Sequence, residues 1–220
     1  MRILLMILMS VSMLCSCEHE DVSYLTDEYK IGNIVCSDGS IIHPSLYSSQ
    51  NRAVGVIFWV NGDNDGTTDK AYAVSLQSLG EHILVPDSLC EDIQNVSSDK
   101  LSFNGFNNTV GFQTFMLDKK SKFPAIINVV EYSPYGKKGW YIGSIAQEQR
   151  LFESRHIVNE TLAMLQGEEV SGDCWSSTEA EGEEAAALYA LSLNYNSGNV
   201  TPVMKTEKLK IRPFITIDKK

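Results

Sequence analysis

The residues with the clearest chemical pattern lie in the polar segment 61–69, NGDNDGTTD. Four side chains there have the spacing of oxygen ligands in the first half of an EF-hand calcium loop: Asn61, Asp63, Asp65 and Asp69. Tyr72, however, stands where such a loop needs a bidentate acid, and the flanking segments have the pattern of strands. We therefore interpret the segment as a hairpin tip, since Asn, Asp and Gly dominate turns, and expect no bound metal or other cofactor.

Histidines are the next candidates for metal or acid–base chemistry. None of the four has the His-x-x-x-His spacing of a zinc-binding helix: His19, His43, His82 and His156. The chain also lacks the Gly-x-Ser-x-Gly elbow of serine hydrolases and any glycine-rich phosphate loop. A catalytic site would have to draw on scattered positions, so we predict that the protein is not an enzyme.

The first residues, MRILLMILMSVSMLCSCEHED, have the pattern of an export signal. Arg2 precedes an apolar run that is too short to span a bilayer. The run ends in Leu14-Cys15-Ser16-Cys17, which resembles a bacterial lipobox, although cysteine is a less usual residue at the second place before the acylated one. We expect residues 1–16 to be a signal peptide and Cys17 to be lipidated; the alternative is a cleaved signal without lipid.

Residues 17–24 are expected to form an acidic tether between the lipid and the domain. In some Gram-negative lineages, such a stretch resembles a signal for export to the cell surface, and a solvated linker explains the same residues. The protein is thus predicted to be an outer-membrane lipoprotein that contacts the membrane through its anchor. Whether it faces the outside or the periplasm stays open.

Composition restricts the remainder to one globular domain, residues 25–220. Of the 220 residues, 43% are hydrophobic and 21% are charged, which excludes a disordered chain. The net charge of −10, without a basic stripe, excludes a nucleic-acid partner. Cys36, Cys90 and Cys174 are too far apart for a zinc motif and can form at most one disulfide.

The elements that must position any site alternate between strands and helices. Strands are predicted at residues 31–35, 41–42, 53–60, 71–76, 174–177, 187–193 and 208–217, the last interrupted by Pro213 and hence at an edge or bulged. Helices are predicted at residues 112–117, capped by Asn108, at 124–131, and from the capping box at Ser144 to Gly167, with a possible break at 154–156. Trp59, Trp140 and Trp175 are expected in the core, and residues 179–184 in an exposed acidic loop.

Several motifs occur together in the C-terminal half, in a characteristic order: Gly139-Trp140-Tyr141-Ile142, an amphipathic helix, Trp175-Ser176-Ser177-Thr178-Glu179 and Ile211-Arg212-Pro213-Phe214. This order resembles a bacterial C-type-lectin-like family found at the C-terminus of a collagen-like adhesin and in surface lipoproteins. Earlier pieces match as well, among them Ser37-Asp38-Gly39-Ser40, so the resemblance covers most of residues 30–217. The family usually has Leu-Pro-Ser where this chain has Ile142-Gly143-Ser144.

The resemblance implies an α+β fold of the C-type-lectin-like type. Two helices would pack on a twisted antiparallel sheet, and a β-hairpin region would precede them. Sugar binding through calcium is not implied, because the Glu-Pro-Asn or Gln-Pro-Asp loop of animal lectins is absent. Formylglycine-generating enzymes resemble the same fold but need paired cysteines, and only Cys174 lies in the corresponding region.

Receptor-binding relatives of this fold display variable residues on their last strands. Here that region supplies four side chains suited to adaptable contacts: Tyr189, Asn194, Tyr195 and Asn196. We predict that this face binds a ligand, a host or bacterial surface protein or a glycan, in the manner of an adhesin or receptor. The alternatives are a structural subunit of a surface appendage or envelope assembly and an uncharacterised enzyme on a fold like that of the formylglycine-generating enzymes.

Replacing Cys17 by Ala is expected to abolish membrane anchoring, because the acyl chains would lose their attachment point. Cell fractionation followed by immunoblotting of the full-length chain measures this. A variant that still fractionates with the membrane would show that the lipobox assignment is wrong.

Overall fold

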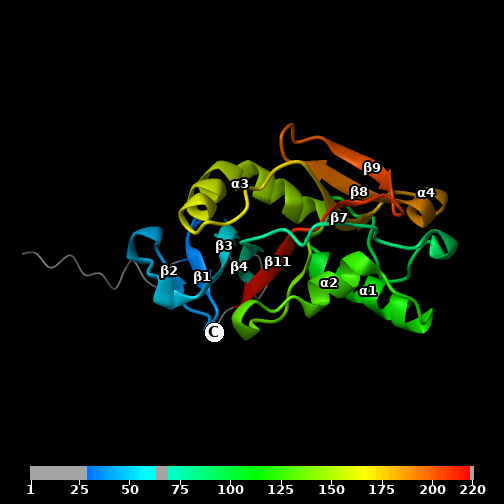
Figure 1. The fold of residues 1–220 in the computed structure, drawn as a ribbon. Coiled ribbons are helices and arrows are strands. Elements are labelled where there is room, and N and C mark those ends of the chain that lie inside the picture. The colour runs from blue at the N-terminus through cyan, green and yellow to red at the C-terminus, as the bar shows by residue number, and fades with distance from the viewer. Residues whose placement is uncertain (1–28, 63–68, 219–220) are drawn as a thin grey trace, which may run out of the picture.

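The structure, a computed structural model, describes residues 29–62 and 69–218 (Figure 1). The predicted signal peptide, the tether and Cys17 lie outside these residues, as do Asp63 and Asp65 of the predicted hairpin tip. Within the described part, the chain forms two sheets and four α-helices, an α+β architecture.

Sheet A has six strands in the order β2-β1-β3-β4-β11-β6. Their bounds are β1 (Ile34–Cys36), β2 (Ile41–Ile42), β3 (Ala53–Val60), β4 (Asp69–Ser75), β6 (Tyr141–Ile142) and β11 (Pro213–Asp218). The predicted strand 53–60 and its returning partner are confirmed as the antiparallel pair β3 and β4. The turn between β1 and β2 is also confirmed, with the amide of Gly39 donating to the carbonyl of Cys36 at 3.0 Å.

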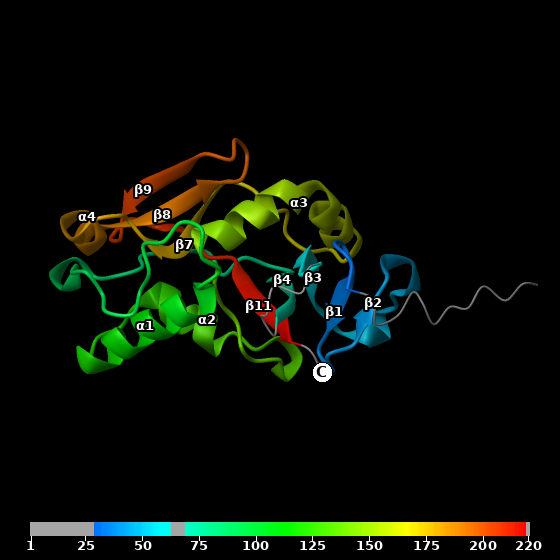
Figure 2. The same ribbon diagram turned by 180° about the vertical axis from the view of Figure 1, so that it is seen from behind.

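Sheet A is covered on both faces, which explains why β3 is apolar throughout. Tyr72 and Val74 of β4 pack with residues of α3 (Ile145–Met164), whereas Ala71 and Ala73 pack with residues of α1 (Gly105–Asp118) and α2 (Pro124–Glu131). Helix α3 therefore lies on one side of the sheet, and α1 and α2 lie on the other (Figures 1 and 2).

Sheet B has five strands in the order β5-β10-β7-β8-β9. Their bounds are β5 (Glu81–His82), β7 (Asp173–Glu179), β8 (Tyr189–Asn194), β9 (Val200–Met204) and β10 (Leu209–Lys210). Strands β10 and β7 run parallel, so the sheets are not wholly antiparallel as predicted. The predicted strand 208–217 is in fact two strands: the chain leaves sheet B after β10 and enters sheet A as β11.

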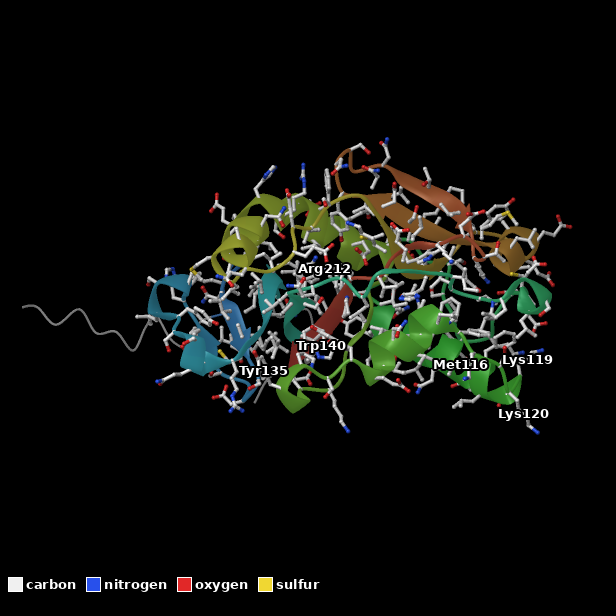
Figure 3. All side chains as sticks on the ribbon, in the orientation of Figure 1. Met116, Lys119, Lys120, Tyr135, Trp140 and Arg212 are labelled. Atoms are coloured by element: carbon white, nitrogen blue, oxygen red, sulfur yellow. The ribbon has the colours of Figure 1, made fainter. Side chains whose placement is uncertain are left out.

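This crossing is held by Arg212, which lies between the two sheets (Figure 3). Its buried guanidinium donates to the carbonyl of Ser75 at 3.0 Å, that of Leu76 at 3.3 Å and that of Glu168 at 2.7 Å. Pro213 follows without disturbing the sheet, although β11 is central between β4 and β6. The edge alternative is thus wrong, whereas the register of β11 with β4 does shift, between Ile217 and Asp218. The chain tolerates the proline because it occupies the first place of the strand.

Helix boundaries follow the predicted caps, with one exception. The capping box of Ser144 and Gln147 is formed, α3 runs unbroken through residues 154–156, and α2 has its predicted bounds. Helix α1 begins at Gly105, earlier than predicted. Asn108 is not its cap but a buried residue within it, whose side-chain oxygen accepts the amide of Ser97 at 2.9 Å.

Three features of the C-terminal part were not predicted. Strand β9 lies where no element was predicted, and the short helix α4 (Glu183–Leu188) occupies the end of the predicted acidic loop and the start of the predicted strand 187–193. Glu179, expected in an exposed loop, ends β7 and is buried. Short 3-10 helices complete the described elements: Pro44–Leu46, Ser49–Asn51, Asp87–Leu89 and Pro134–Gly136.

The other core expectations are largely met. Trp140 and Trp175 are buried, whereas Trp59 is half-buried and stacks on Tyr72 at 4.9 Å between ring centroids. The cysteines of the described residues, Cys36, Cys90 and Cys174, are free thiols. No helix in the described ranges is both long enough and apolar enough to span a membrane.

One buried carboxyl lies between α3 and the end of sheet B. Glu148 is fully buried, and the Tyr195 hydroxyl donates to its Oε2, while Oε1 has no partner among the described residues. Burial raises the pKa of Glu148 well above its usual value, against the opposing effects of the Tyr195 hydrogen bond and the Arg212 charge. Burial therefore favours the neutral form of this carboxyl in the folded protein.

Glu148→Gln is expected to remove one proton's share of the fall in stability with rising pH, while the share of Glu179, whose pKa is raised to about 7, remains. Above pH 4.5 the unfolded chain releases the Glu148 proton more readily than the folded chain does, so the contribution of Glu148 to the free energy of unfolding falls with rising pH. The slope for one proton approaches about 1.4 kcal/mol per pH unit. Urea unfolding at pH 5, 6 and 7 measures it. Glu153→Gln, at an exposed site on the same helix, should keep the natural slope.

Candidate functional site

A groove of about 560 Å³ opens between α3, α4 and the last strands of sheet B. The elements that carry much of its lining, β8, β9 and α4, lie close together in the ribbon diagram (Figure 1). The described residues that line it are mostly apolar: Lys100, Ile145, Gln149, Ala180, Glu181, Ala185, Tyr189, Leu191, Val200 and Pro202. Concave, largely apolar surfaces with a few polar groups are typical of binding sites.

The strand register explains the floor of the groove. Tyr189 and Leu191 are two residues apart on β8, and Pro202 lies opposite Leu191 on β9. Because side chains two residues apart share a face of a sheet, these residues point to the same side as Val200. Ile145, at the start of α3, closes the groove from the other side.

Tyr189 is fixed at the junction of α4 and β8. Its amide caps α4 by donating to the carbonyl of Ala185, and its own carbonyl accepts the amide of Ala180 at 3.0 Å. The ring is half-buried, so one part is supported by the protein and another faces the groove. A tyrosine with its backbone held in this way presents an apolar ring with a polar tip.

The rim is polar and solvated. Lys100 and Glu181 approach to 3.6 Å, but their side chains are 53% and 80% exposed, so the ion pair contributes little to stability. Gln149 is exposed on α3 at the same rim. An apolar floor with a weak, solvent-exposed ion pair at its rim suits a ligand that has an apolar or aromatic group surrounded by polar atoms.

The structure does not bring the four predicted ligand-binding residues together. Tyr189 lies in the groove, while Asn194, Tyr195 and Asn196 lie at the opposite end of β8, about 17 Å away for a strand of this length. Tyr195 is only 1% exposed and hydrogen-bonds Glu148, so the expectation that it contacts a ligand is wrong.

The asparagines belong to the turn that follows β8. The Asn194 side chain donates to Asp173 at 2.9 Å and accepts the amides of Asn196 and Ser197 at 3.0 Å each. Asn196 is exposed, and its side-chain oxygen accepts the amide of Gly172 at 3.4 Å. These contacts order the turn, which is the alternative reading of such residues at a strand end.

The described ligands of the predicted calcium loop are engaged with the protein. The Asn61 side chain donates to the backbone carbonyl of Asp69 at 3.2 Å, and the Tyr72 hydroxyl donates to the Asp69 carboxylate at 2.5 Å. Asp69 also lines a second cavity of about 490 Å³ with aromatic and basic neighbours. Within residues 29–62 and 69–218, no cluster of three His, Cys, Asp or Glu side chains is arranged to hold a metal ion.

The three described histidines lie in separate places. His43 caps a 3-10 helix, His156 is exposed on α3, and the His82 ring contacts the carbonyl of Leu79 at 2.8 Å and the amide of Asn128 at 3.1 Å. None of them lines the groove beside Tyr189.

The groove residues that sequence reasoning missed are ordinary apolar side chains. Ile145, Ala180, Ala185 and Val200 come from four different segments, and nothing in their types distinguishes them from core residues. The available signal was Pro202 among β-branched residues, VTPV, which is typical of an edge strand.

The fold and the site therefore define the class of this protein as an α+β domain with a groove open to solvent. The sequence matches no family model and no curated protein. Among solved structures, the chain is similar to a fimbrial protein from Bacteroides ovatus, with a TM-score of 0.64 and 16% identity. The match covers 84% of this chain and 48%, about half, of the fimbrial protein. It therefore shows a shared fold over that half of the fimbrial protein and nothing more.

Calcium is expected to leave the melting temperature nearly unchanged, because the described candidate ligands already bond to one another. A site filled at 100 times its dissociation constant would add about 2.7 kcal/mol and raise the melting temperature by several degrees. Calorimetry with and without millimolar calcium measures the difference. A rise of that size would restore residues 61–69 as a calcium site.

Proposed function

We propose that the protein is a lipid-anchored, non-catalytic binding protein of the bacterial cell envelope. Its ligand would occupy the groove beside Tyr189, in the manner of an adhesin or receptor. The groove carries this proposal, because it places a tyrosine and an apolar floor in a concavity open to solvent.

We also propose that the domain has the C-type-lectin-like fold. The motifs behind the resemblance occupy structural positions in support of it: Trp140 and Trp175 are core residues, Ser144 caps α3, and Arg212 precedes the closing strand. Gly143 replaces the usual proline where space is short. A Cβ there would lie 2.4 Å from the Phe214 ring, so this chain needs glycine at that place.

The chemistry of the groove favours a protein ligand over a glycan. A sugar needs several convergent hydrogen-bonding groups, whereas the floor here offers Ile145, Leu191 and Val200. Such a floor suits an apolar or aromatic side chain from a partner, with Lys100 and Glu181 free to exchange their exposed ion pair for contacts at the rim.

An envelope location rests on the lipobox at Cys17 and the acidic tether. The structural likeness to a fimbrial protein is consistent with a place at the cell surface. It also favours the alternative function, a structural subunit of a surface appendage.

The sheet edges argue against assembly by strand addition. Three of the four described edge strands, β2, β5 and β6, have two residues each, and the fourth is β9. Backbone hydrogen bonds join Asn194 to Asn199 and Leu188 to Lys205. Hydrogen-bonded and non-hydrogen-bonded pairs alternate along an antiparallel ladder, so the pair Leu191–Pro202 is not hydrogen-bonded and the nitrogen of Pro202 faces the free edge of β9. That edge therefore lacks a donor at its centre.

Tyr189→Ala is expected to weaken ligand binding at least tenfold without loss of the fold, because truncating a central aromatic anchor commonly costs about 2 kcal/mol or more. The full-length chain in detergent is screened against arrays of surface proteins and glycans. The dissociation constant of the strongest ligand is then measured for the variant.

The matched control is Tyr135→Asn, at a tyrosine that is 66% exposed and remote from the groove. Asparagine tolerates the left-handed backbone of that residue, where φ is 49°. Equal affinities of the natural protein and the Tyr189 variant would discard the groove as the binding site. Binding of glycans alone would overturn the preference for a protein ligand.

A further inference from the structure

A charged pair is enclosed where β7 ends. Glu179 and Lys205 form an ion pair, and their side chains are 1% and 0% exposed. The Lys205 ammonium also donates to the carbonyl of Glu91 at 3.0 Å, and Glu179 Oε1 accepts the amide of Ile93 at 3.4 Å. Both contacts to Glu179 fall on Oε1. Its Oε2 is buried and has no partner among the described residues.

Glu179 is also part of the wall of a cavity of about 310 Å³. Asp92 and Glu183 line the same cavity, and both are exposed to solvent. Its remaining described lining is small or neutral: Val96, Ser98, Gly182 and Ala186. Three carboxylates thus surround this space, and Lys205 balances the charge of one of them.

We propose that this cavity binds a single organic cation, an alkylammonium or guanidinium group, through Glu179, Asp92 and Glu183. Charge-assisted hydrogen bonds to carboxylates are the strongest that such groups make, and the unpartnered Glu179 oxygen would gain a donor. A metal ion fits less well, since no described cluster of three ligating side chains is arranged to hold one. The site is separate from the groove and does not depend on its function.

The position of the cavity connects it with the groove. Ala180, Glu181 and Ala185 line the groove, whereas Glu179, Gly182 and Glu183 line the cavity. The short segment that ends β7 and begins α4 therefore separates the two. A partner protein lying across this segment could insert an apolar side chain on one side and a lysine or arginine on the other.

The cation site predicts a specific pH dependence. Burial raises the pKa of Glu179 to about 7, against the attraction of Lys205 and with the repulsion of Asp92. The charged groups near the Glu179 carboxyl are Lys205, Asp92 and Glu183. The Cys90 thiol lies near the Lys205 ammonium. A cation prefers the ionised carboxylate, so its affinity should rise about tenfold between pH 6 and pH 8, in step with the ionised fraction of Glu179.

The test uses ligand-observed NMR on the full-length chain in detergent, with acetyl-arginine amide as the probe. Acetyl-citrulline amide, which has nearly the same shape and no charge, is the matched ligand control. We expect the arginine probe to bind, the citrulline probe not to bind, and the arginine affinity to rise with pH as stated. Equal binding of both probes, or an affinity independent of pH, would overturn the site.

Two sets of variants locate the binding. Asp92→Asn with Glu183→Gln changes only exposed side chains and should reduce the affinity at least tenfold, whereas Glu181→Gln, on the groove side of the same segment, should not. Glu179→Gln with Lys205→Met removes both buried charges together, so neither is left unpaired, and it should abolish the pH dependence. Unchanged binding in the first double variant would refute the proposal.

The source of the cation is distinguished by two further probes, agmatine and a peptide with arginine between two leucines. Tighter binding of the peptide would support a side chain of a partner protein, and equal binding of agmatine would support a free amine. Absence of binding by every cation at millimolar concentration would overturn the inference.

Discussion

The arrangement of the two sheets depends on Arg212. Its guanidinium is buried where the chain passes from sheet B to sheet A, and it donates to carbonyls of residues 75, 76 and 168. Those carbonyls belong to the end of β4 and to the loop after α3, so one side chain fixes the relative positions of both sheets and the long helix. A lysine could not replace it, because only the planar fork presents several donors in fixed directions.

Local signals were sufficient to predict the elements that carry them. The capping box at Ser144 set the start of α3, Pro124 set the start of α2, and the apolar run at 53–60 gave β3. Elements without such signals were missed or misplaced. Asn108 looks like a helix cap but serves as a buried acceptor for Ser97, and the split of 208–217 into two strands depends on contacts of Arg212 with distant segments.

The candidate site was predictable only in part, for the same reason. Tyr189 was recognised by its residue type, but Tyr195, of the same type and directly after the same strand, proved to be buried against Glu148. Residue type alone cannot separate the two, because their exposure depends on how α3 packs: Glu148 meets the Tyr195 hydroxyl, whereas the groove stays open beside Tyr189. Glu179 and Lys205 gave no signal at all, since charged residues in a polar stretch normally lie at the surface.

The central place of β11 has a consequence for biosynthesis. In the described chain this strand follows every other strand of sheet A, yet the sheet needs it between β4 and β6. A growing chain therefore cannot complete either its long-range strand pairing or the Arg212 contacts until residues 212–218 have been made. Until then β4 keeps one edge unpaired, and such an edge is a template for pairing with another chain.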